Sequence, residues 1–399
     1  MYIQLRRGIK TLNRVQMVAK ETVSFAKKIY SEEFIPLHRP IFEGNERKNL
    51  IECIDSNFVS SVGQKVTDFE NMIADFTGSN YAVATVNGTS ALHVALEISG
   101  IGAGDEVITQ ALTFIATCNS IHYARAIPVF IDVDKDTMGM SPSSLKSFLE
   151  KNARKQNGQV FNKNSGRRIR GCLPMHTFGF PCRIIEIAAI CDDWGIALIE
   201  DAAESLGSYV NNRHTGTFGK LGTFSFNGNK VITTGGGGMI VTNDFTFAQR
   251  AKHITTTAKI PHAFNFEHDE IGYNYRMPNL NAALGCAQVE QLEYFLHRKS
   301  ELAKLWDNLY QHLGIKFMRS LVNCKSNHWL ITIILENIQE RDYFLEFTNK
   351  NGVMCRPIWN LMSNLSMFSN CERDDLKNSK WLQDRGVNIP SSVPVRYSE

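Results

Sequence analysis

The sequence predicts an α/β fold with a central, mostly parallel sheet, followed by a smaller α+β unit. Between residues 81 and 244, short apolar runs alternate with helical patterns, which is typical of layered α/β domains. Several runs are apolar on consecutive positions, as expected of strands that helices cover on both faces. Near residue 280 a long helical pattern replaces the alternation. The 399 residues suffice for two domains, each with its own core.

The predicted elements follow the chain in order. Seven runs are predicted as strands of the central sheet: 81–86, 105–110, 126–133, 169–175, 196–201, 222–226 and 238–242. Helices are predicted between them at 89–99, 115–125, 141–151 and 183–194. Leucines at helical spacing from Leu284 to Leu313 predict a long connecting helix, and the smaller unit is predicted to hold strands at 328–335 and 352–359 around a helix at 341–351. The expected domains are an N-terminal extension or helix (1–35), a large domain (36–280), and the connecting helix with a small C-terminal domain (281–399).

Composition and charge exclude several classes of protein. A formal net charge of +3 is too balanced to indicate nucleic-acid binding, and no apolar run is long enough to span a membrane. The densest basic run, 154–170, is interrupted by Gly, Asn and Ser and is predicted to be a solvated loop. Nine cysteines without a CxxC pair predict free thiols in a reducing cytoplasm and no metal site.

The opening residues carry several basic side chains and no acid before Glu21. This composition faintly resembles a transit peptide. A natural start at Met17, with residues 1–16 as translated upstream sequence, is the simpler interpretation.

One glycine-rich stretch, "FNGNKVITTGGGGM" at 226–239, places Lys230 shortly before four glycines. Glycines in a row are tolerated where backbone passes close to a bound group. Asp201 ends a predicted strand at the sheet edge where open α/β sheets bind ligands, and the strand-to-helix turn at 87–93 offers free N–H groups to a phosphate. Phe114 adds an aromatic face. A lysine, an acid, a phosphate site and an aromatic ring together predict pyridoxal 5′-phosphate (PLP).

Six motifs then identify a family resemblance: "NGTSALHVAL", "GDEVITQALTFIATCNSI", "PVFIDVD", "IEDAAESLGS", "GTFSFNGNKVITTGGGGM" and "GYNYRMPNLNAALG". With them, the sequence resembles the DegT/DnrJ/EryC1/StrS family of PLP-dependent sugar aminotransferases from about Phe34 to Val393. The resemblance implies the aspartate aminotransferase-like fold, fold type I. The segments "TTTAKIPHAFNFEHDEIGYNYRMPNLNAALGCAQ" and "NGVMCRPIWNLM" resemble the branch that aminates UDP-4-keto-6-deoxy-N-acetylhexosamines for legionaminic acid or bacillosamine-type sugars.

The resemblance implies roles for residues around the cofactor ring. Lys230 would form the Schiff base with PLP, and Asp201 would bind the ring nitrogen. Glu204 would lie near the phenolic oxygen, and Phe114 would stack on the ring. Gly236 departs from the family pattern, because many relatives carry an acid there.

The resemblance also implies a phosphate site that two subunits share. The N–H groups of Gly88, Thr89 and Ser90 and the Ser225 hydroxyl would hold the phosphate. Asn274 would reach it from the partner subunit, so a homodimer with composite active sites is expected.

The expected substrates are L-glutamate and a nucleotide sugar. By resemblance, the acceptor would be UDP-2-acetamido-2,6-dideoxyhexos-4-ulose, aminated at C4 for a bacterial surface glycan. Candidate sugar-nucleotide contacts are His176, Arg276, His328, Arg356 and Trp359.

Several alternatives stay open at this point. The acceptor could be a dTDP- or GDP-linked 4-keto-6-deoxysugar, or the chain could bind PLP without transaminase activity. A PLP-dependent sugar dehydratase of the same fold would carry histidine in place of Lys230, which argues against that reaction. Taken singly, Asp201 could cap the following helix and Phe114 could be a core residue.

Overall fold

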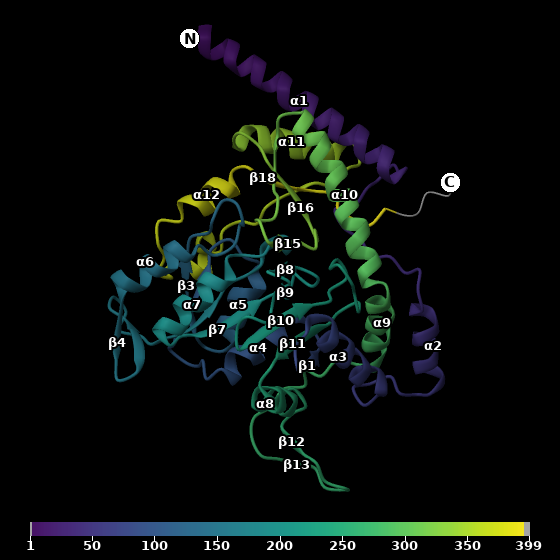
Figure 1. Ribbon diagram of the computed structural model, residues 1–399, viewed down its shortest axis with the longest axis vertical. Coiled ribbons are helices and arrows are strands. Elements are labelled where there is room, and N and C mark those ends of the chain that lie inside the picture. Colours follow the sequence, from purple (N-terminus) through teal and green to yellow (C-terminus); the bar gives the residue numbers. More distant parts are fainter. Residues whose placement is uncertain (1, 395–399) are drawn as a thin grey trace.

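The computed structural model describes residues 2–394, and for residues 2–13 it describes the backbone alone. Its large unit is a seven-stranded sheet in the order β1–β11–β10–β7–β6–β2–β3 (Figure 1). Strand β11 is antiparallel to both neighbours, and the other six strands run in one direction. The predicted mixed, mostly parallel sheet is confirmed. Its members are β1 (Tyr81–Thr85), β2 (Glu106–Gln110), β3 (Ile127–Ile131), β6 (Ile169–Leu173), β7 (Ala197–Asp201), β10 (Leu221–Ser225) and β11 (Gly238–Thr242).

Helices cover both faces of this sheet. One face carries α4 (Gly88–Ile98), α5 (Ile115–Tyr123) and α8 (Phe245–Thr255), and the other carries α3 (Gln64–Thr77), α6 (Pro142–Asn152), α7 (Ile184–Trp194) and α9 (Asn279–Glu290). Successive strand residues point to opposite faces, so Val107 packs with the α4 side while Ile108 packs with the α6 side. Helices bury both faces of the sheet, which explains why several of these strands are apolar on consecutive positions.

The basic run predicted as a loop is a hairpin instead. Strands β4 (Ala153–Gln156) and β5 (Gln159–Asn162) pair antiparallel around Asn157 and Gly158, which both have positive φ. An Asn-Gly turn of this kind matches the twist of a two-residue hairpin. The turn therefore favours paired strands here, although the polar composition of the run is typical of a loop. Helices α2 (Glu46–Asp55), α3 and α8 were also not predicted.

The smaller unit is built on a four-stranded antiparallel sheet in the order β14–β16–β18–β17. Helices α1 (Tyr2–Tyr30), α10 (Leu292–His312) and α11 (Ile338–Lys350) pack against it around buried Trp306 and Tyr310 (Figure 1, top). The predicted connecting helix is two helices, because α9 ends at Glu290 and α10 begins at Leu292. The sheet contains β14 (Lys316–Phe317), β16 (Ile331–Ile334), β17 (Arg356–Pro357) and β18 (Gly386–Ile389).

The remaining elements are short. A three-stranded sheet joins the two units through β8 (Tyr209–Val210), β9 (Arg213–His214) and β15 (Cys324–Lys325). The other elements are η1 (Thr177–Gly179), η2 (Met362–Asn364), η3 (Ser366–Phe368) and α12 (Lys377–Gln383). Among the described residues, no helix has the length and apolar character needed to cross a membrane.

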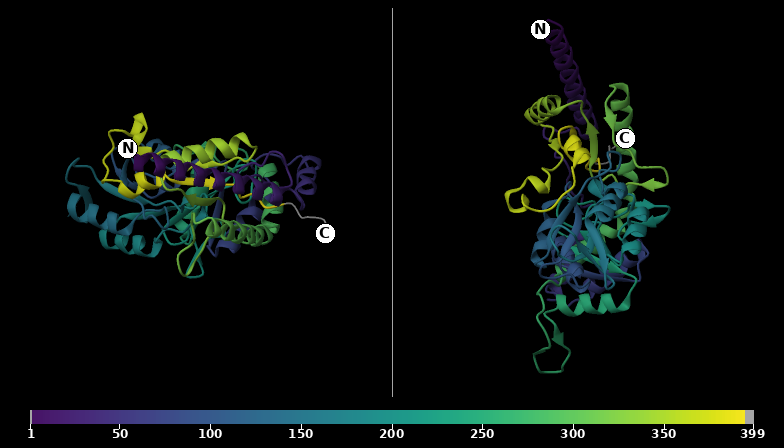
Figure 2. Two further views of the ribbon diagram at one scale, coloured as in Figure 1. Left: turned by 90° about the horizontal axis from the view of Figure 1, so that it is seen from above. Right: turned by 90° about the vertical axis from the view of Figure 1, so that its left-hand side faces the viewer.

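A hairpin arm projects from the large unit at the end opposite α1 (Figure 2). It contains β12 (Lys259–Ile260) and β13 (Glu267–His268), and its tip exposes the rings of Phe264 and Phe266. On the return from the arm, Asn274 bridges Thr256 and Arg276 bridges Thr85 of β1.

Lys299 on α10 is a buried lysine, with only 1% of its surface exposed. Its Nζ donates to the carbonyl oxygens of Trp329, at 3.3 Å, and of Ser391. No carboxylate forms an ion pair with it among residues 2–394. Burial lowers the pKa of Lys299 from its ordinary 10.5 to about 7.

This burial predicts a pH-dependent stability. Between pH 7 and 10.5 the unfolded chain binds a proton at Lys299 that the folded chain does not, so the free energy of unfolding rises with pH in that window. We expect the thermal midpoint of the cofactor-free protein to rise from pH 7 to pH 9 more steeply than that of Lys299→Met. Calorimetry of both proteins measures the difference, and parallel profiles would contradict the assignment.

Candidate active site

A cavity of about 720 Å³ lies at the carboxyl edge of the large sheet, where the smaller unit covers it. Six strands share one direction, so the loops after β1, β2, β7 and β10 meet at this edge. The smaller unit adds a wall from residues 329–330, 356–360 and 388. The structure brings together these predicted residues: Gly88, Thr89, Phe114, Asp201, Glu204, Ser225, Lys230, Gly236, Arg356 and Trp359.

Lys230 extends into this cavity from the turn after β10. Its Nζ donates to Glu204 Oε1 at 3.0 Å and lies 3.9 Å from the ring centroid of Trp329. The other oxygen of Glu204 accepts a hydrogen bond from the backbone N–H of Phe178 at 2.8 Å. Burial raises the pKa of Glu204 to about 7. An amino group and a carboxyl group that titrates near neutrality therefore share one buried contact.

Asp201 is the last residue of β7, and 2% of its surface is exposed. Its carboxylate accepts hydrogen bonds from Thr117 Oγ1 at 2.7 Å and from the Ala203 N–H at 3.2 Å. Burial raises the pKa of Asp201, while these donors and the Lys230 charge lower it in part. A cation opposite the carboxylate would further offset the effect of burial on the pKa of Asp201, so this residue fits the protonated ring nitrogen of PLP.

The start of α4 fits a phosphate. A Cβ on Gly88 would lie 2.9 Å from Ser225 Cβ, so only glycine brings the bare backbone beside the Ser225 hydroxyl. Helix N-termini favour anions because their N–H groups lack intrahelical partners. The Ser90 N–H donates to the Asn87 side chain at 2.8 Å as part of the helix cap, and its role at the phosphate stays a prediction. Gly88, Thr89 and Ser225 line the cavity, and Ser90 does not.

This contact predicts a loss of cofactor affinity in Gly88→Ala. The added methyl group would overpack the contact with Ser225, and we expect the PLP dissociation constant to rise about tenfold. Gly236→Ala is the matched control, because a Cβ there meets only Val86 O at 3.8 Å. Fluorescence titration of the cofactor-free proteins with PLP measures both constants. Equal affinities for the two variants would contradict the phosphate assignment.

The glycine-rich stretch folds back on β10. Gly235 has a φ of +79°, and a Cβ on Gly237 would lie 2.2 Å from Thr234 Oγ1. The chain reverses here so that Phe226 pairs with both Thr234 and Gly237. A Cβ on Gly236 would meet Val86 O at 3.8 Å, which is ordinary van der Waals contact.

Two predicted substrate residues line the cavity from the smaller unit. Arg356 and Lys230 are the cationic residues among those that line it, and the Trp359 ring lies 5.7 Å from Phe114 and 4.5 Å from Phe178. An exposed arginine beside aromatic rings is suited to a diphosphate and a planar base or sugar face.

His176 and His328 are not among the residues that line the cavity, so their roles as substrate contacts stay predictions. His176 is fully buried, donates from Nε2 to Glu200 at 2.9 Å and accepts from the Cys182 N–H at Nδ1. His328 lies edge-on to Phe180, and burial lowers its pKa to about 4. In each case a neighbour in sequence, Met175 or Trp329, lines the cavity.

Arg276 and Asn274 lie outside the cavity of their own chain. Arg276 stands opposite Thr85 in an isolated bridge, and its buried Nε has no hydrogen-bond partner among the described residues. Asn274 is exposed at the base of the arm. The contribution of Asn274 to the partner subunit's phosphate site stays a prediction.

Sequence reasoning missed several residues at this site. Trp329 contacts Lys230, and Thr117 holds Asp201, yet both occur in segments whose pattern indicates only buried structure. Asn227, Asn229 and Asn388 also line the cavity. The polar composition around Lys230 could have indicated Asn227 and Asn229, and the sequence gives no comparable signal for the other residues.

Comparison with known proteins identifies the family. The model of the DegT/DnrJ/EryC1/StrS aminotransferase family matches residues 40–397. The chain belongs to this family. This aminotransferase is 36% identical over 378 residues to EpsN of Bacillus subtilis, whose name describes a pyridoxal phosphate-dependent aminotransferase, covering 94% of this chain and 93% of EpsN.

Two further similarities support the same assignment. The aminotransferase is 35% identical to the GDP-perosamine synthase of Escherichia coli O157:H7, covering 90% of this chain and 93% of that protein. The solved structure of an aminotransferase from Psychrobacter cryohalolentis superposes with a TM-score of 0.78 at 27% identity, covering 90% and 93% of the two chains. The predicted aminotransferase fold, PLP dependence and sugar aminotransferase class are thereby confirmed.

Proposed function

We propose that this aminotransferase moves an amino group from L-glutamate to C4 of a nucleotide-linked 4-keto-6-deoxysugar, in the cytoplasm, for a bacterial surface glycan. The observation that carries the proposal is one cavity that joins the Lys230 amino group, the Asp201 carboxylate and the bare backbone of Gly88. Each of these groups suits a different part of PLP. The domain boundaries near residues 35 and 280 also stay predictions.

The residues that would hold PLP follow from this chemistry. Lys230 would bind it covalently, Asp201 would face its ring nitrogen, and Phe114 would cover its ring. Gly88, Thr89 and Ser225 would hold its phosphate. Bound there, PLP supplies an electron sink for the transfer of the amino group.

The chain's own groups would then manage the protons. Lys230 Nζ would take the proton from the α carbon of the amino donor and return a proton to the acceptor carbon. Glu204 holds this amine in place and titrates near neutrality, so it is suited to keep a proton beside the reacting centre. Asp201, ionised and buried, would hold a positive charge on the ring nitrogen.

The acceptor we propose is UDP-2-acetamido-2,6-dideoxyhexos-4-ulose. The sequence resemblance to the UDP-N-acetylhexosamine branch supports it. Arg356 and Trp359 line the cavity, and we propose Arg356 for the diphosphate and Trp359 for a ring face. A GDP-linked 4-keto-6-deoxysugar is the second candidate, because GDP-perosamine synthases from three bacteria are 33 to 35% identical over at least 90% of this chain.

The test is incubation of the PLP-loaded protein with glutamate and a panel of UDP-, dTDP- and GDP-linked 4-keto-6-deoxysugars. Mass spectrometry and NMR identify the aminated product. Amination of the UDP-N-acetyl acceptor at the highest kcat/KM supports the proposal. A preference for the GDP acceptor overturns the substrate assignment alone, and no amination of any acceptor overturns the function.

We also propose that two copies share their active sites. The arm presents exposed Phe264 and Phe266, and Asn274 at its base lies outside its own cavity. Lys230→Ala and Asn274→Ala, each inactive alone, should regain activity when mixed and allowed to exchange subunits, because one site of the mixed dimer then carries neither change. A monomer in light scattering, or no regained activity, would contradict the shared site.

A further inference from the structure

We propose that Trp329, supported from behind by the buried Lys299, is a positioning residue that holds the Lys230 amino group at the cofactor site. The proposal rests on the role proposed for Lys230. It assigns a function to two residues that the reaction described above does not use.

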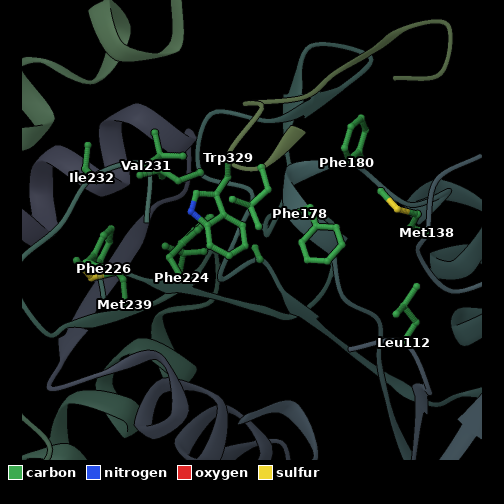
Figure 3. Close-up of a cluster of buried hydrophobic side chains, with 14 of the residues drawn as sticks. Leu112, Met138, Phe178, Phe180, Phe224, Phe226, Val231, Ile232, Met239 and Trp329 are labelled. Carbon is green, nitrogen blue, oxygen red and sulfur yellow. The ribbon is translucent and has the colours of Figure 1, made fainter. Parts of the chain in front are cut away.

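Trp329 is fixed in place from several sides. Its side chain is 4% exposed, and its indole N–H donates to the carbonyl oxygen of Asn229 at 2.6 Å, one residue before Lys230. Its ring stands beside Phe178, with centroids 6.4 Å apart, in the same buried cluster as Phe224 (Figure 3). The turn that carries Lys230 and the ring that faces its amine are thus tied together.

The backbone of Trp329 is held as firmly as its ring. Its carbonyl oxygen accepts hydrogen bonds from Ser391 Oγ at 2.8 Å and from Lys299 Nζ at 3.3 Å. Lys299 also donates to the Ser391 carbonyl, so it links α10, the entry to β16 and the exit from β18. A buried lysine that binds two carbonyls and no carboxylate stabilises little by itself, and its position behind Trp329 indicates a positioning role.

The contact with Lys230 has a physical consequence. A desolvated cation–π contact attracts an ammonium group to the ring face, and the carboxylate of Glu204 attracts it from another element. Two fixed partners leave the amine few orientations, and orientation governs how fast a bound nucleophile reacts. Removing the ring should therefore slow the reactions of the amine more than it weakens substrate binding.

The experiment follows the visible absorbance that appears when PLP is added to the cofactor-free protein. We expect Trp329→Leu to slow this covalent capture about tenfold, and Trp329→Phe to slow it less, because phenylalanine keeps an aromatic face. In the loaded enzyme, kcat with glutamate should fall while KM stays within about twofold. Trp306→Phe is the matched control, since its indole N–H donates to Pro390 O at 3.1 Å in the core of the smaller unit.

Lys299→Met tests the support from behind. We expect it to slow capture several-fold in the wild-type background and to add nothing to Trp329→Leu, because residues that act through one another are non-additive. Circular dichroism and thermal midpoints verify that each variant is folded. Lys299→Arg, which keeps a donor, should retain more of the rate than Lys299→Met.

Different results overturn different claims. A wild-type rate in folded Trp329→Leu, an equal loss in Trp306→Phe, or additive effects of Lys299→Met and Trp329→Leu would overturn this inference alone. A visible band that persists in Lys230→Ala would overturn the role of Lys230 and this inference with it.

Discussion

Replacing Lys230 by alanine is expected to lower kcat by at least about a thousandfold, because the variant loses both the covalent attachment of PLP and the amine that moves the proton. Among the described residues, no second lysine lines the cavity, since Lys230 and Arg356 are the cationic residues there. The measurement is kcat for the half-reaction with glutamate, with the visible spectrum of the loaded protein as a second readout.

The matched control for Lys230 is Lys252→Ala. The amine of Lys252 also binds a glutamate, Glu70, at 2.6 Å, but on α8 and away from the cavity. This variant should keep its spectrum and most of its activity. Borohydride reduction of the wild-type holoenzyme should fix PLP on Lys230, and a label on another lysine would refute the assignment.

Asp201→Asn is expected to lower kcat by about a hundredfold or more while the protein keeps its fold. Asparagine has the same shape, and its side-chain oxygen can still accept from Thr117, but it carries no charge to hold a proton on the ring nitrogen. The half-reaction with glutamate measures this loss, and activity within tenfold of the wild type would contradict the role of Asp201.

Asp201 also predicts how activity depends on pH. Burial raises its pKa, and the role proposed here needs the ionised form, so activity should fall as pH falls through that raised pKa. Thr117→Val removes a hydrogen bond that favours the carboxylate, and it should move the acid limb of the kcat profile to higher pH. An acid limb at the same pH in Thr117→Val and the wild type would mean that a group other than Asp201 controls the loss of activity at low pH.

The central sheet was predictable because its strands are buried on both faces and several of them are apolar on consecutive positions. Once six strands run in one direction, their carboxyl ends meet, and Asp201, Phe114 and the turn at residue 87 must come together. Lys230 was identifiable because four consecutive glycines supply no side chains for core packing, and they follow this lysine closely in the sequence. The helices α2, α3 and α8 were missed because the sheet pattern gave no information on what precedes or follows it.

The outer wall of the site was harder to predict. The chemistry of imidazole suggests His176 and His328 as contacts, but both lie in irregular loop segments whose side-chain positions depend on tertiary packing, and neither lines the cavity. Trp329 stands beside His328 in sequence and reads as a core residue, and its contact with Lys230 depends on tertiary packing. The residue for covalent chemistry could therefore be predicted from local sequence, whereas the residues of the smaller unit that line the cavity depend on long-range contacts.

The position of that wall along the chain has a consequence for biosynthesis. Residues 356–360 and Asn388 complete the cavity, and they are translated long after Lys230. Until Trp329 has also been translated, Lys230 lacks the ring that lies 3.9 Å from its amine in the folded chain. Stable capture of vitamin B6 should thus await the last segments of the polypeptide, so nonsense-truncated products would remain colourless.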